Sequence, residues 1–290
     1  MHPLLQQLLA HGPVITDGAW GTQLQSRGLP VGACPDLWNL DHPEGVEEVA
    51  RAYVEAGSQI ILTNTFGSNR FTLDRHGAAE KVAAINRAGV EVSRRAADGR
   101  AKVFASIGPS GVMLMMGQTT AAELQSAFAE QAQAMADAGA DALVIETMSD
   151  PAETRVAIAA AKATGLPVVA CMVFDSGKSH DRTMMGTTPE QAAEALLEAG
   201  ADLIGSNCGQ GIAGFVPICE RLHAAAGGPV WIKANAGLPQ FVDGQTVYAQ
   251  SASQFADYAP ALIAAGAGFL GGCCGTTPEF IRALCGKVPS

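Results

Sequence analysis

Hydrophobic positions follow two alternating periods along this chain. Short runs of Val, Ile, Leu and Phe, typical of buried strands, alternate with longer segments rich in Ala and Glu whose apolar residues recur with a helical period. The runs predict strands over residues 14–19, 59–66, 102–109, 141–148, 167–174, 202–209, 229–237 and 268–275. The longer segments predict helices over residues 43–56, 79–98, 120–138, 151–164, 189–199, 212–226, 253–265 and 278–285.

The ends of the predicted helices carry residues that favour starting or stopping a helix. Several helices run into a glycine, which supplies the left-handed conformation that closes a helix. At other places a proline follows a capping residue, as in Asp150-Pro151 and Thr277-Pro278. Asp150 and Glu153 also have the spacing of a capping box. These signals support the boundaries that the hydrophobic pattern predicts.

Eight strand–helix units in 290 residues are the number expected of a (β/α)8 TIM barrel. The alternative is an open, doubly wound sheet. Regular units without an obvious linker favour the closed barrel, and we expect a single domain over residues 1–290. The stretches 67–77 and 175–187 are longer than minimal connections, which makes them candidates for the rim of an active site.

Composition and charge narrow the class of protein. Hydrophobic residues make up 48% and charged residues 16%, which fits a soluble enzyme with a large core. A net charge of −10 without a basic run argues against nucleic acid and anionic membranes as partners. Residues 1–13 lack the features of a signal peptide and predict a short helix, and no apolar run approaches a transmembrane length. We therefore expect a cytoplasmic protein with reduced thiols.

Polar residues stand where the predicted strands end. In a barrel enzyme the carboxyl ends of the strands surround the active site. We therefore expect the side chains at these ends to meet at one mouth of the barrel. They are Asp17, Asn64, Thr65, Glu146, Cys208, Asn235, Cys273 and Cys274.

Three of the seven cysteines are candidates for a metal site. Cys208 ends the sixth predicted strand, and Cys273 and Cys274 end the eighth, so we expect the three thiols on neighbouring strands at one mouth. Three thiolates suit zinc, which takes soft ligands in a tetrahedron. Adjacent strand residues point to opposite faces, so we expect the glycines at 271, 272 and 275 to give the backbone freedom for both sulfurs to converge. A purely structural Cys-Cys pair is the alternative.

Such a zinc ion would favour one kind of chemistry. With three sulfur ligands it is electron-rich, and it binds a further sulfur better than it activates water. A substrate thiol on zinc loses its proton near neutral pH and becomes a nucleophile. Asp17 and Glu146 could then hold an ammonium group of the substrate, although a helix cap, turn or salt bridge is the alternative role for either acid.

The motifs and their order resemble a known family. The segments DGAWGTQLQSRG, LTNTFGSNR, GPSG, ETMSD, GSNCG, ANAG and GGCCGTTPEFIRAL follow one another between residues 14 and 285. This order is similar to that of the homocysteine S-methyltransferase family. The resemblance implies a (β/α)8 barrel in which Cys208, Cys273 and Cys274 bind zinc, and the zinc binds the sulfur of homocysteine.

The resemblance also implies roles for residues around the zinc. Asp17 and Glu146 match the positions that hold the amino group of homocysteine. The backbone at Gly18 and Ala19 would meet its carboxylate, and Asn235 matches a residue that can take the fourth zinc position when substrate is absent. The expected product is methionine.

The methyl donor is a separate question, because the family divides by donor. PDLWNLDHPE and RTMMGTTPE resemble short bacterial betaine–homocysteine methyltransferases, so betaine is favoured; S-methylmethionine and a methyl-corrinoid protein acting in trans are the alternatives. No folate or cobalamin domain is expected within the chain, and a homo-oligomer is one possible assembly. Aromatic faces attract the quaternary ammonium of betaine. The candidates for that donor pocket are Trp20, Trp38, Phe66 and Phe71.

Other functions remain as alternatives from the residues alone. Lys233, on the seventh predicted strand, could form a Schiff base in a barrel lyase or aldolase. A zinc-binding or corrinoid-docking subunit without its own activity is a second alternative. Phosphate binding by the loops after the seventh and eighth strands is a third.

Overall fold

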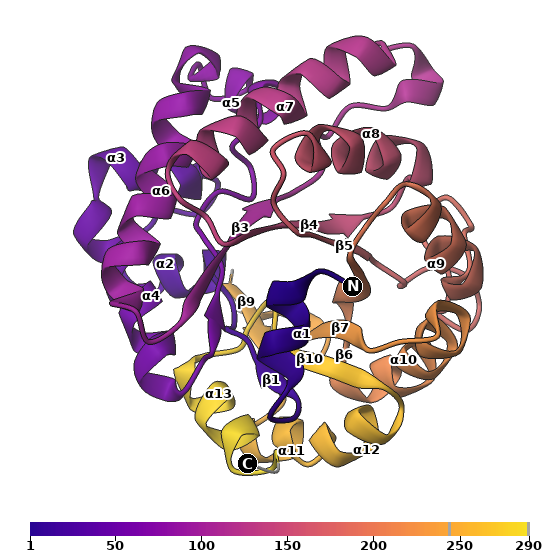
Figure 1. Ribbon diagram of the computed structural model, residues 1–290. Helices are drawn as coiled ribbons and strands as arrows, with labels where there is room; N and C mark the ends of the chain where they lie inside the picture. Colours follow the sequence, from indigo (N-terminus) through magenta and orange to yellow (C-terminus); the bar gives the residue numbers. More distant parts are fainter. Residues whose placement is uncertain (243–244, 289–290) are drawn as a thin grey trace.

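Eight parallel strands form a closed barrel with helices around it (Figure 1). The computed structural model describes residues 1–242 and 245–288. The strand order is β1-β10-β7-β6-β5-β4-β3-β2. A parallel bridge between Thr16 and Ile60 joins the first strand to the second and completes the ring. The predicted (β/α)8 barrel is therefore confirmed, and the open-sheet alternative is wrong.

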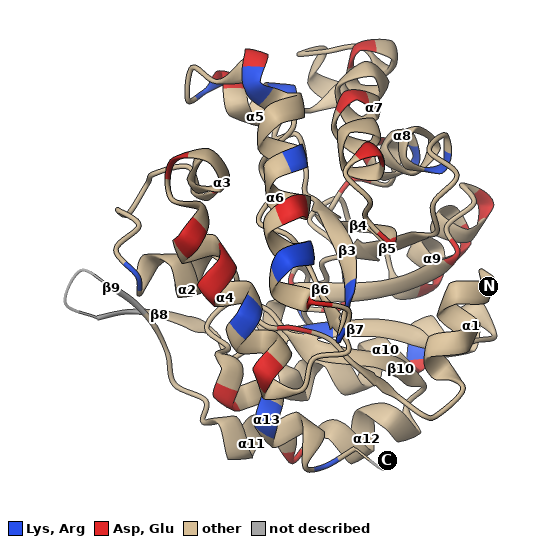
Figure 2. Cartoon of the chain, turned by 60° about the vertical axis from the view of Figure 1, so that its left-hand side comes forward, with Lys and Arg blue, Asp and Glu red and all other residues tan. Residues whose placement is uncertain are grey.

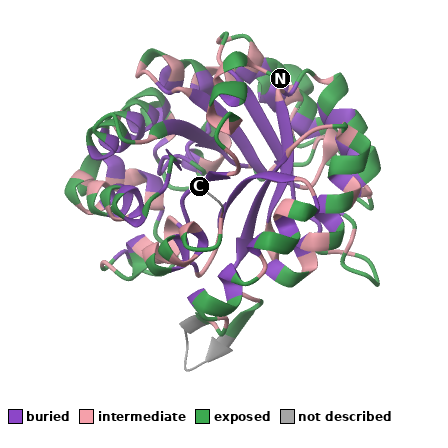
Figure 3. Ribbon diagram, turned by 60° about the horizontal axis from the view of Figure 1, so that its bottom comes forward, coloured by how far each residue is buried: buried purple, intermediate pink, exposed green. Residues whose placement is uncertain are grey.

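The barrel strands overlap the eight predicted runs, and all except β6 are shorter than predicted. Because both faces of a parallel strand are buried, these strands are almost continuously apolar. The bounds are β1 (Val14–Ile15), β2 (Ile60–Ile61), β3 (Lys102–Ile107), β4 (Ala142–Met148), β5 (Val168–Met172), β6 (Leu203–Gly211), β7 (Val230–Asn235) and β10 (Ala267–Gly272). Figure 3 shows that they make up the buried centre of the molecule.

Helices cover the outside of the barrel, largely where the sequence predicts them. The predicted helix 253–265 is two helices, because Pro260 cannot continue a helix from the preceding turn. The bounds are α1 (Pro3–Leu9), α2 (Gly21–Gln25), α3 (Trp38–Asp41), α4 (Pro43–Ala56), α5 (Arg70–Asp74), α6 (Val82–Ala97), α7 (Ala121–Asp137), α8 (Pro151–Lys162), α9 (Pro189–Glu198), α10 (Ile212–Ala226), α11 (Ala252–Ala256), α12 (Ala259–Ala264) and α13 (Pro278–Cys285). Within the described residues, no helix combines the length and apolar character needed to cross a membrane.

The interior of the barrel has an apolar lower part and a polar upper part. Trp231 stacks with Phe104 and Phe269, with ring centroids 6.0 and 5.5 Å away. Helix α1 closes the amino-terminal end, where its Leu5 joins this cluster (Figure 1). Two residues further along a strand the side chain returns to the same face. Lys233 therefore lies above Trp231 on β7, and polar side chains occupy the mouth.

One element was not predicted. After β7 the chain forms an antiparallel hairpin of β8 (Pro239–Val242) and β9 (Gln245–Tyr248). Figure 2 shows it projecting from the body of the barrel. It follows the carboxyl end of a barrel strand, so it belongs to the active-site face.

Charged residues lie mainly on the helices that surround the barrel (Figure 2). Glu47 on α4, for example, forms ion pairs with Arg51 on the same helix and with Arg95 on α6, the latter at 3.1 Å. These groups are partly exposed, so each pair contributes about 1 kcal/mol or less to stability. The ion pair between Lys233 and Asp17 differs from these because it is buried near the mouth of the barrel.

Candidate active site

A cavity of about 600 Å³ opens at the carboxyl ends of the strands. Most of the predicted site residues line it, so the structure places them at one mouth of the barrel. Asp17, Thr65 and Asn235 are buried and are not among the lining residues. The predicted residues that line it are Gly18, Ala19, Trp20, Asn64, Phe66, Glu146, Cys208, Cys273 and Cys274.

The three predicted thiols meet in this cavity. The sulfurs of Cys208, Cys273 and Cys274 all lie within 4.8 Å of one another, and those of Cys208 and Cys274 are 4.0 Å apart. The expectation that their strands are neighbours is wrong, because β7 lies between β6 and β10. The sulfurs therefore meet across β7, above its carboxyl end.

The backbone explains how sulfurs from two strands converge. Cys208 has a φ of +64°, which is uncommon for a residue other than glycine, at a shift of register between β6 and β7. On the other side, β10 ends at Gly272, and the next two residues leave the regular strand direction. The amide of Cys273 still donates to the carbonyl of Ala234 at 2.7 Å, which fixes this turn against β7.

The glycines around the cysteine pair have two different functions. Gly275 has a φ of +79°, so it provides the predicted conformational freedom. Gly271 and Gly272 do not have a positive φ; they permit close approach instead. An added Cβ would lie 2.0 Å from the Thr16 hydroxyl at Gly271 and 2.2 Å from the Thr276 hydroxyl at Gly272. The expectation of backbone freedom was therefore wrong for these two.

The three thiols share protons and negative charge. Hydrogen bonds from Cys273 and Cys274 lower the pKa of Cys208. The same hydrogen bonds raise the pKa of Cys273 and Cys274. A thiolate is the form that binds a metal. The Cys208 sulfur therefore carries negative charge readily. Cys273 and Cys274 would bind a metal cation as thiolates, with the cation taking the place of their protons.

These residues fit a soft metal ion. In addition to the three sulfurs, the Asn235 side chain lies close enough to Cys208 to help lower the pKa of that thiol. The Asn235 Oδ1 atom is buried and has no hydrogen-bond partner. A buried carbonyl oxygen without a partner is costly. It is available as a fourth donor beside the thiols.

Glu146 lies at the end of β4, inside the cavity. Its carboxylate accepts hydrogen bonds from the Ser106 hydroxyl and, at 3.3 Å, from the Asn207 amide nitrogen. Burial raises the pKa of Glu146 to about 7, although the Lys233 ammonium opposes the shift. A cationic ligand beside it would favour the charged form.

Asp17 is fully engaged by neighbouring groups. Its Oδ2 accepts hydrogen bonds from the Leu62 amide at 2.7 Å and from the Trp20 indole at 2.8 Å. Its Oδ1 forms a buried ion pair with Lys233, whose Nζ also donates to the Asp17 carbonyl at 3.0 Å. Asp17 thus joins the loop after β1 to β2 and β7.

The backbone after Asp17 is held just as closely. The Ala19 amide donates to the Thr276 hydroxyl at 3.1 Å, and the Tyr53 hydroxyl donates to the Ala19 carbonyl at 2.7 Å. A Cβ on Gly18 would lie 2.7 Å from both hydroxyls. Gly18 therefore allows this loop to pack against α4 and the turn after β10.

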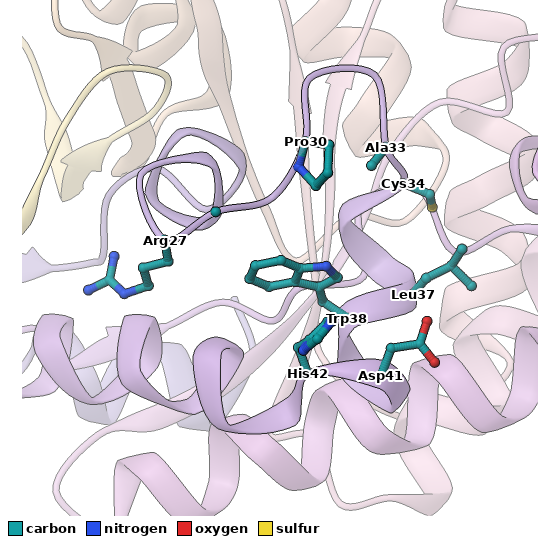
Figure 4. Close-up of a pocket in the computed structure, with 9 residues that line it drawn as sticks. Arg27, Pro30, Ala33, Cys34, Leu37, Trp38, Asp41 and His42 are labelled. Carbon is teal, nitrogen blue, oxygen red and sulfur yellow. The ribbon is translucent and has the colours of Figure 1, made fainter.

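The four predicted aromatic residues do not share one pocket. Trp20 and Phe66 line the cavity that contains the thiols. Trp38 lines a neighbouring cavity of about 550 Å³, where Figure 4 shows it among Arg27, Leu37 and His42. The two cavities share Ala33 and Cys34, but Trp38 does not line the cavity with the thiols. Phe71 lies on α5 and is in neither lining set. Only Trp20 and Phe66 can therefore meet a ligand that is also close to the thiols.

Three residues of the site were not singled out from the sequence. Asn207 donates to Thr147 at 2.7 Å and lies 3.9 Å from the Cys273 sulfur, so it links β4, β6 and the cysteine turn. Its position next to Cys208 in the GSNCG motif could have identified it as a site residue. Ser106 lies within an apolar strand, and Tyr248, which contacts Cys274, belongs to the unpredicted hairpin. No sequence motif marked Ser106 or Tyr248 as a site residue.

Similar proteins were found by sequence. The chain matches the model of a family described as Homocysteine S-methyltransferase over residues 14–288. It is 31% identical to methionine synthase of Mycobacterium leprae over 98% of this chain and 25% of that protein. It spans about a quarter of the length of such methionine synthases. It is also 27% identical to betaine–homocysteine S-methyltransferase 1 of Bos taurus, over 97% of this chain and 73% of that protein.

A similar structure has also been solved. The homocysteine methyltransferase MmuM of Escherichia coli, in a metallated form, matches with a TM-score of 0.82 and 25% identity, over 99% of this chain and 100% of that chain. The family match extends across the barrel and includes the three cysteines. The chain therefore belongs to the homocysteine S-methyltransferase family.

Proposed function

We propose that this protein is a zinc-dependent methyltransferase that converts homocysteine to methionine. The observation that carries the proposal is the group of three thiols within 4.8 Å of one another in the cavity. Zinc–sulfur bonds of about 2.3 Å place the sulfurs of a tetrahedral site about 3.8 Å apart. The cluster needs only a small contraction to reach that spacing.

Zinc held by Cys208, Cys273 and Cys274 would lower the pKa of the homocysteine thiol and keep its sulfur as a thiolate at neutral pH. Asn235 would fill the fourth position when no substrate is present. Asn207 orients both this cluster and Glu146, because it contacts each of them. The protein would then contribute by holding the homocysteine sulfur in line with the methyl group of the donor.

The substrate's amino group fits the carboxylate of Glu146, which lies in the cavity and is strongly desolvated. A substrate ammonium beside Glu146 would restore its charged form. Asp17 lies behind the cavity wall, where its carboxylate contacts Lys233 and Trp20. The backbone at Gly18 and Ala19 forms the adjoining wall.

Betaine is the favoured donor. The homocysteine sulfur attacks a methyl carbon of betaine; the new sulfur–carbon bond forms as the carbon–nitrogen bond breaks, and the electron pair stays on nitrogen. Trp20 and Phe66 supply aromatic faces for the quaternary ammonium. Donation from a methyl-corrinoid protein in trans is the second candidate, because the similarity to methionine synthases covers 98% of the chain. S-methylmethionine is a third.

A lyase or aldolase mechanism is less well supported. A Schiff base requires a neutral lysine amine as the nucleophile. The Lys233 ammonium is buried in an ion pair with Asp17. That contact occupies the nitrogen that would have to attack a carbonyl carbon. Trapping with borohydride and a carbonyl substrate is expected to leave Lys233 unmodified.

Methionine formation tests the proposal. Purified, zinc-loaded protein is incubated with homocysteine and, separately, with betaine, S-methylmethionine or methylcobalamin. Turnover with betaine alone is the expected result. Turnover with methylcobalamin alone would assign the chain to a corrinoid system, and no methionine from any donor would contradict the proposed reaction. We expect the protein to act in the cytoplasm, where its thiols stay reduced.

A further inference from the structure

We propose that Lys233 binds the carboxylate of the acceptor substrate and thereby selects thiols that carry an α-carboxylate. The inference rests on the proposed function, because it adds a contact to the same acceptor. Lys233 lies on the inner face of β7 and is 1% exposed. Within the described cavity wall it is the only Lys or Arg.

The ammonium of Lys233 has one donor left for a ligand. A lysine ammonium has three N–H donors. Its contacts within the described residues are the Asp17 carbonyl and the Asp17 carboxylate. A buried ammonium with a spare proton, facing a cavity, favours an anionic oxygen as its partner.

The backbone offers less to the substrate's carboxylate than the family resemblance implies. The Ala19 amide, one of the two groups expected to meet it, already donates to the Thr276 hydroxyl. A carboxylate brought from water into this cavity needs charged or hydrogen-bonding partners. Lys233 is a cation in the cavity wall that can meet this need.

The cavity also presents two opposite charges. Glu146 and Lys233 both line it and interact electrostatically. An α-amino acid carries an ammonium and a carboxylate on one carbon, so it complements such a pair. Asp17 then holds Lys233 in place rather than serving as the main partner of the substrate's amino group.

The alternative is that Lys233 only neutralises Asp17. Two variants separate these roles. Asp17→Asn removes the buried charge that Lys233 balances, and the double variant Asp17→Asn/Lys233→Met removes both members of the pair. In Asp17→Asn the amide oxygen can still accept a hydrogen bond from Lys233, and in the double variant neither charge of the pair is left buried alone. The comparison between the two variants isolates Lys233.

The experiment measures the equilibrium binding of homocysteine and of homocysteine amide to zinc-loaded protein by calorimetry, together with KM and kcat. The amide lacks the carboxylate but keeps the thiol and the amino group. Relative to Asp17→Asn, the double variant is expected to bind homocysteine roughly 10- to 100-fold more weakly. Its affinity for the amide should change by less than about threefold, on the same scale. The kinetic loss should appear in KM rather than in kcat.

Equal affinities of the two variants for homocysteine would overturn the inference, and so would equal losses for homocysteine and its amide. These outcomes differ from failure of the proposed function. If no donor gives methionine, the reaction is wrong, and the binding data still report on the carboxylate. If methionine forms and Lys233 does not discriminate between the two ligands, only the assignment of Lys233 fails.

Discussion

The chemistry of this protein depends on a few residues whose neighbours determine their state. Three thiols, a buried carboxylate and a buried lysine share one cavity. Cys208 and Glu146 could be singled out from the sequence because they end apolar strands. The positive φ of Cys208 and the pairing of Asp17 with Lys233 could not, because both depend on contacts with other strands.

Replacing any one of the three thiols should remove the metal. Cys208→Ala, Cys273→Ala and Cys274→Ala are each expected to lose bound zinc and at least about 100-fold in turnover, because a site with two thiolates holds zinc weakly. Cys219→Ala is the matched control; this cysteine is buried beneath α12 and bonds to the Ala265 carbonyl. Mass spectrometry measures the metal content of the three variants and of the control. Full zinc in all three variants would rule out the cluster as the metal site.

Glu146 should make the metal-free protein less stable as pH rises. Burial raises its pKa from 4.5 to about 7 in the folded state, so the native protein binds the extra proton between these values. Its stabilising effect is complete below about pH 4.5 and is lost as pH rises through 7. Relative to Glu146→Gln, the native chain should lose on the order of 3 kcal/mol between pH 5 and pH 8. Urea unfolding of both proteins measures this; parallel curves would contradict it.

Trp20 and Trp38 should differ in their effect on the donor. Trp20→Leu is expected to raise KM for betaine roughly 2- to 30-fold, the range of a lost cation–π contact. Trp38→Leu should leave it unchanged, because Trp38 lines a different cavity (Figure 4). Trp20→Phe keeps an aromatic face and loses the hydrogen bond to Asp17. An effect of Trp38 equal to that of Trp20 would show that the two cavities do not act separately.

At the scale of elements, the sequence predicts most of the barrel because its periodicities are strong. All eight barrel strands overlap predicted runs; six fall inside them, whereas β6 ends two residues later and β10 begins one residue earlier than predicted. The hairpin of β8 and β9 was missed, although an Asp-Gly pair in the sequence at 243–244 is a hairpin signal. The expected capping box of α8 does not form. Asp150 caps the helix, but Glu153 instead accepts hydrogen bonds from Ser110, a contact that depends on the loop after β3.

The turn after β10 should tolerate no side chain at Gly272. Gly272→Ala places a methyl group 2.2 Å from the Thr276 hydroxyl and is expected to cost about 1–3 kcal/mol. It should also reduce zinc affinity, because Thr276 and the cysteine pair share this turn. Gly228→Ala is the control, since a methyl group there meets nothing within 4 Å. Thermal unfolding and zinc titration measure the two effects. Equal behaviour of the two variants would contradict the packing argument.

At the scale of the whole molecule, we expect the barrel to stay folded without a metal. The hydrophobic core runs between the strands and the outer helices, away from the mouth. Chelation is therefore expected to abolish turnover while far-ultraviolet circular dichroism and cooperative unfolding persist. Some decrease in melting temperature should follow, because a ligand of the native state stabilises it. Loss of secondary structure on chelation would mean that the metal holds the fold.

Closure of the amino-terminal end by α1 has a consequence for the sequence of events in catalysis. Leu5 and the aromatic stack fill that end, so both reactants must use the same entrance. Glu146 and Lys233 lie deep, whereas Phe66 is 42% exposed at the rim. We therefore expect the acceptor to bind first and its methylated product to leave last, because a donor bound at the rim would cover the acceptor. Steady-state kinetics should show a compulsory order, in which the spent donor leaves before the methylated amino acid.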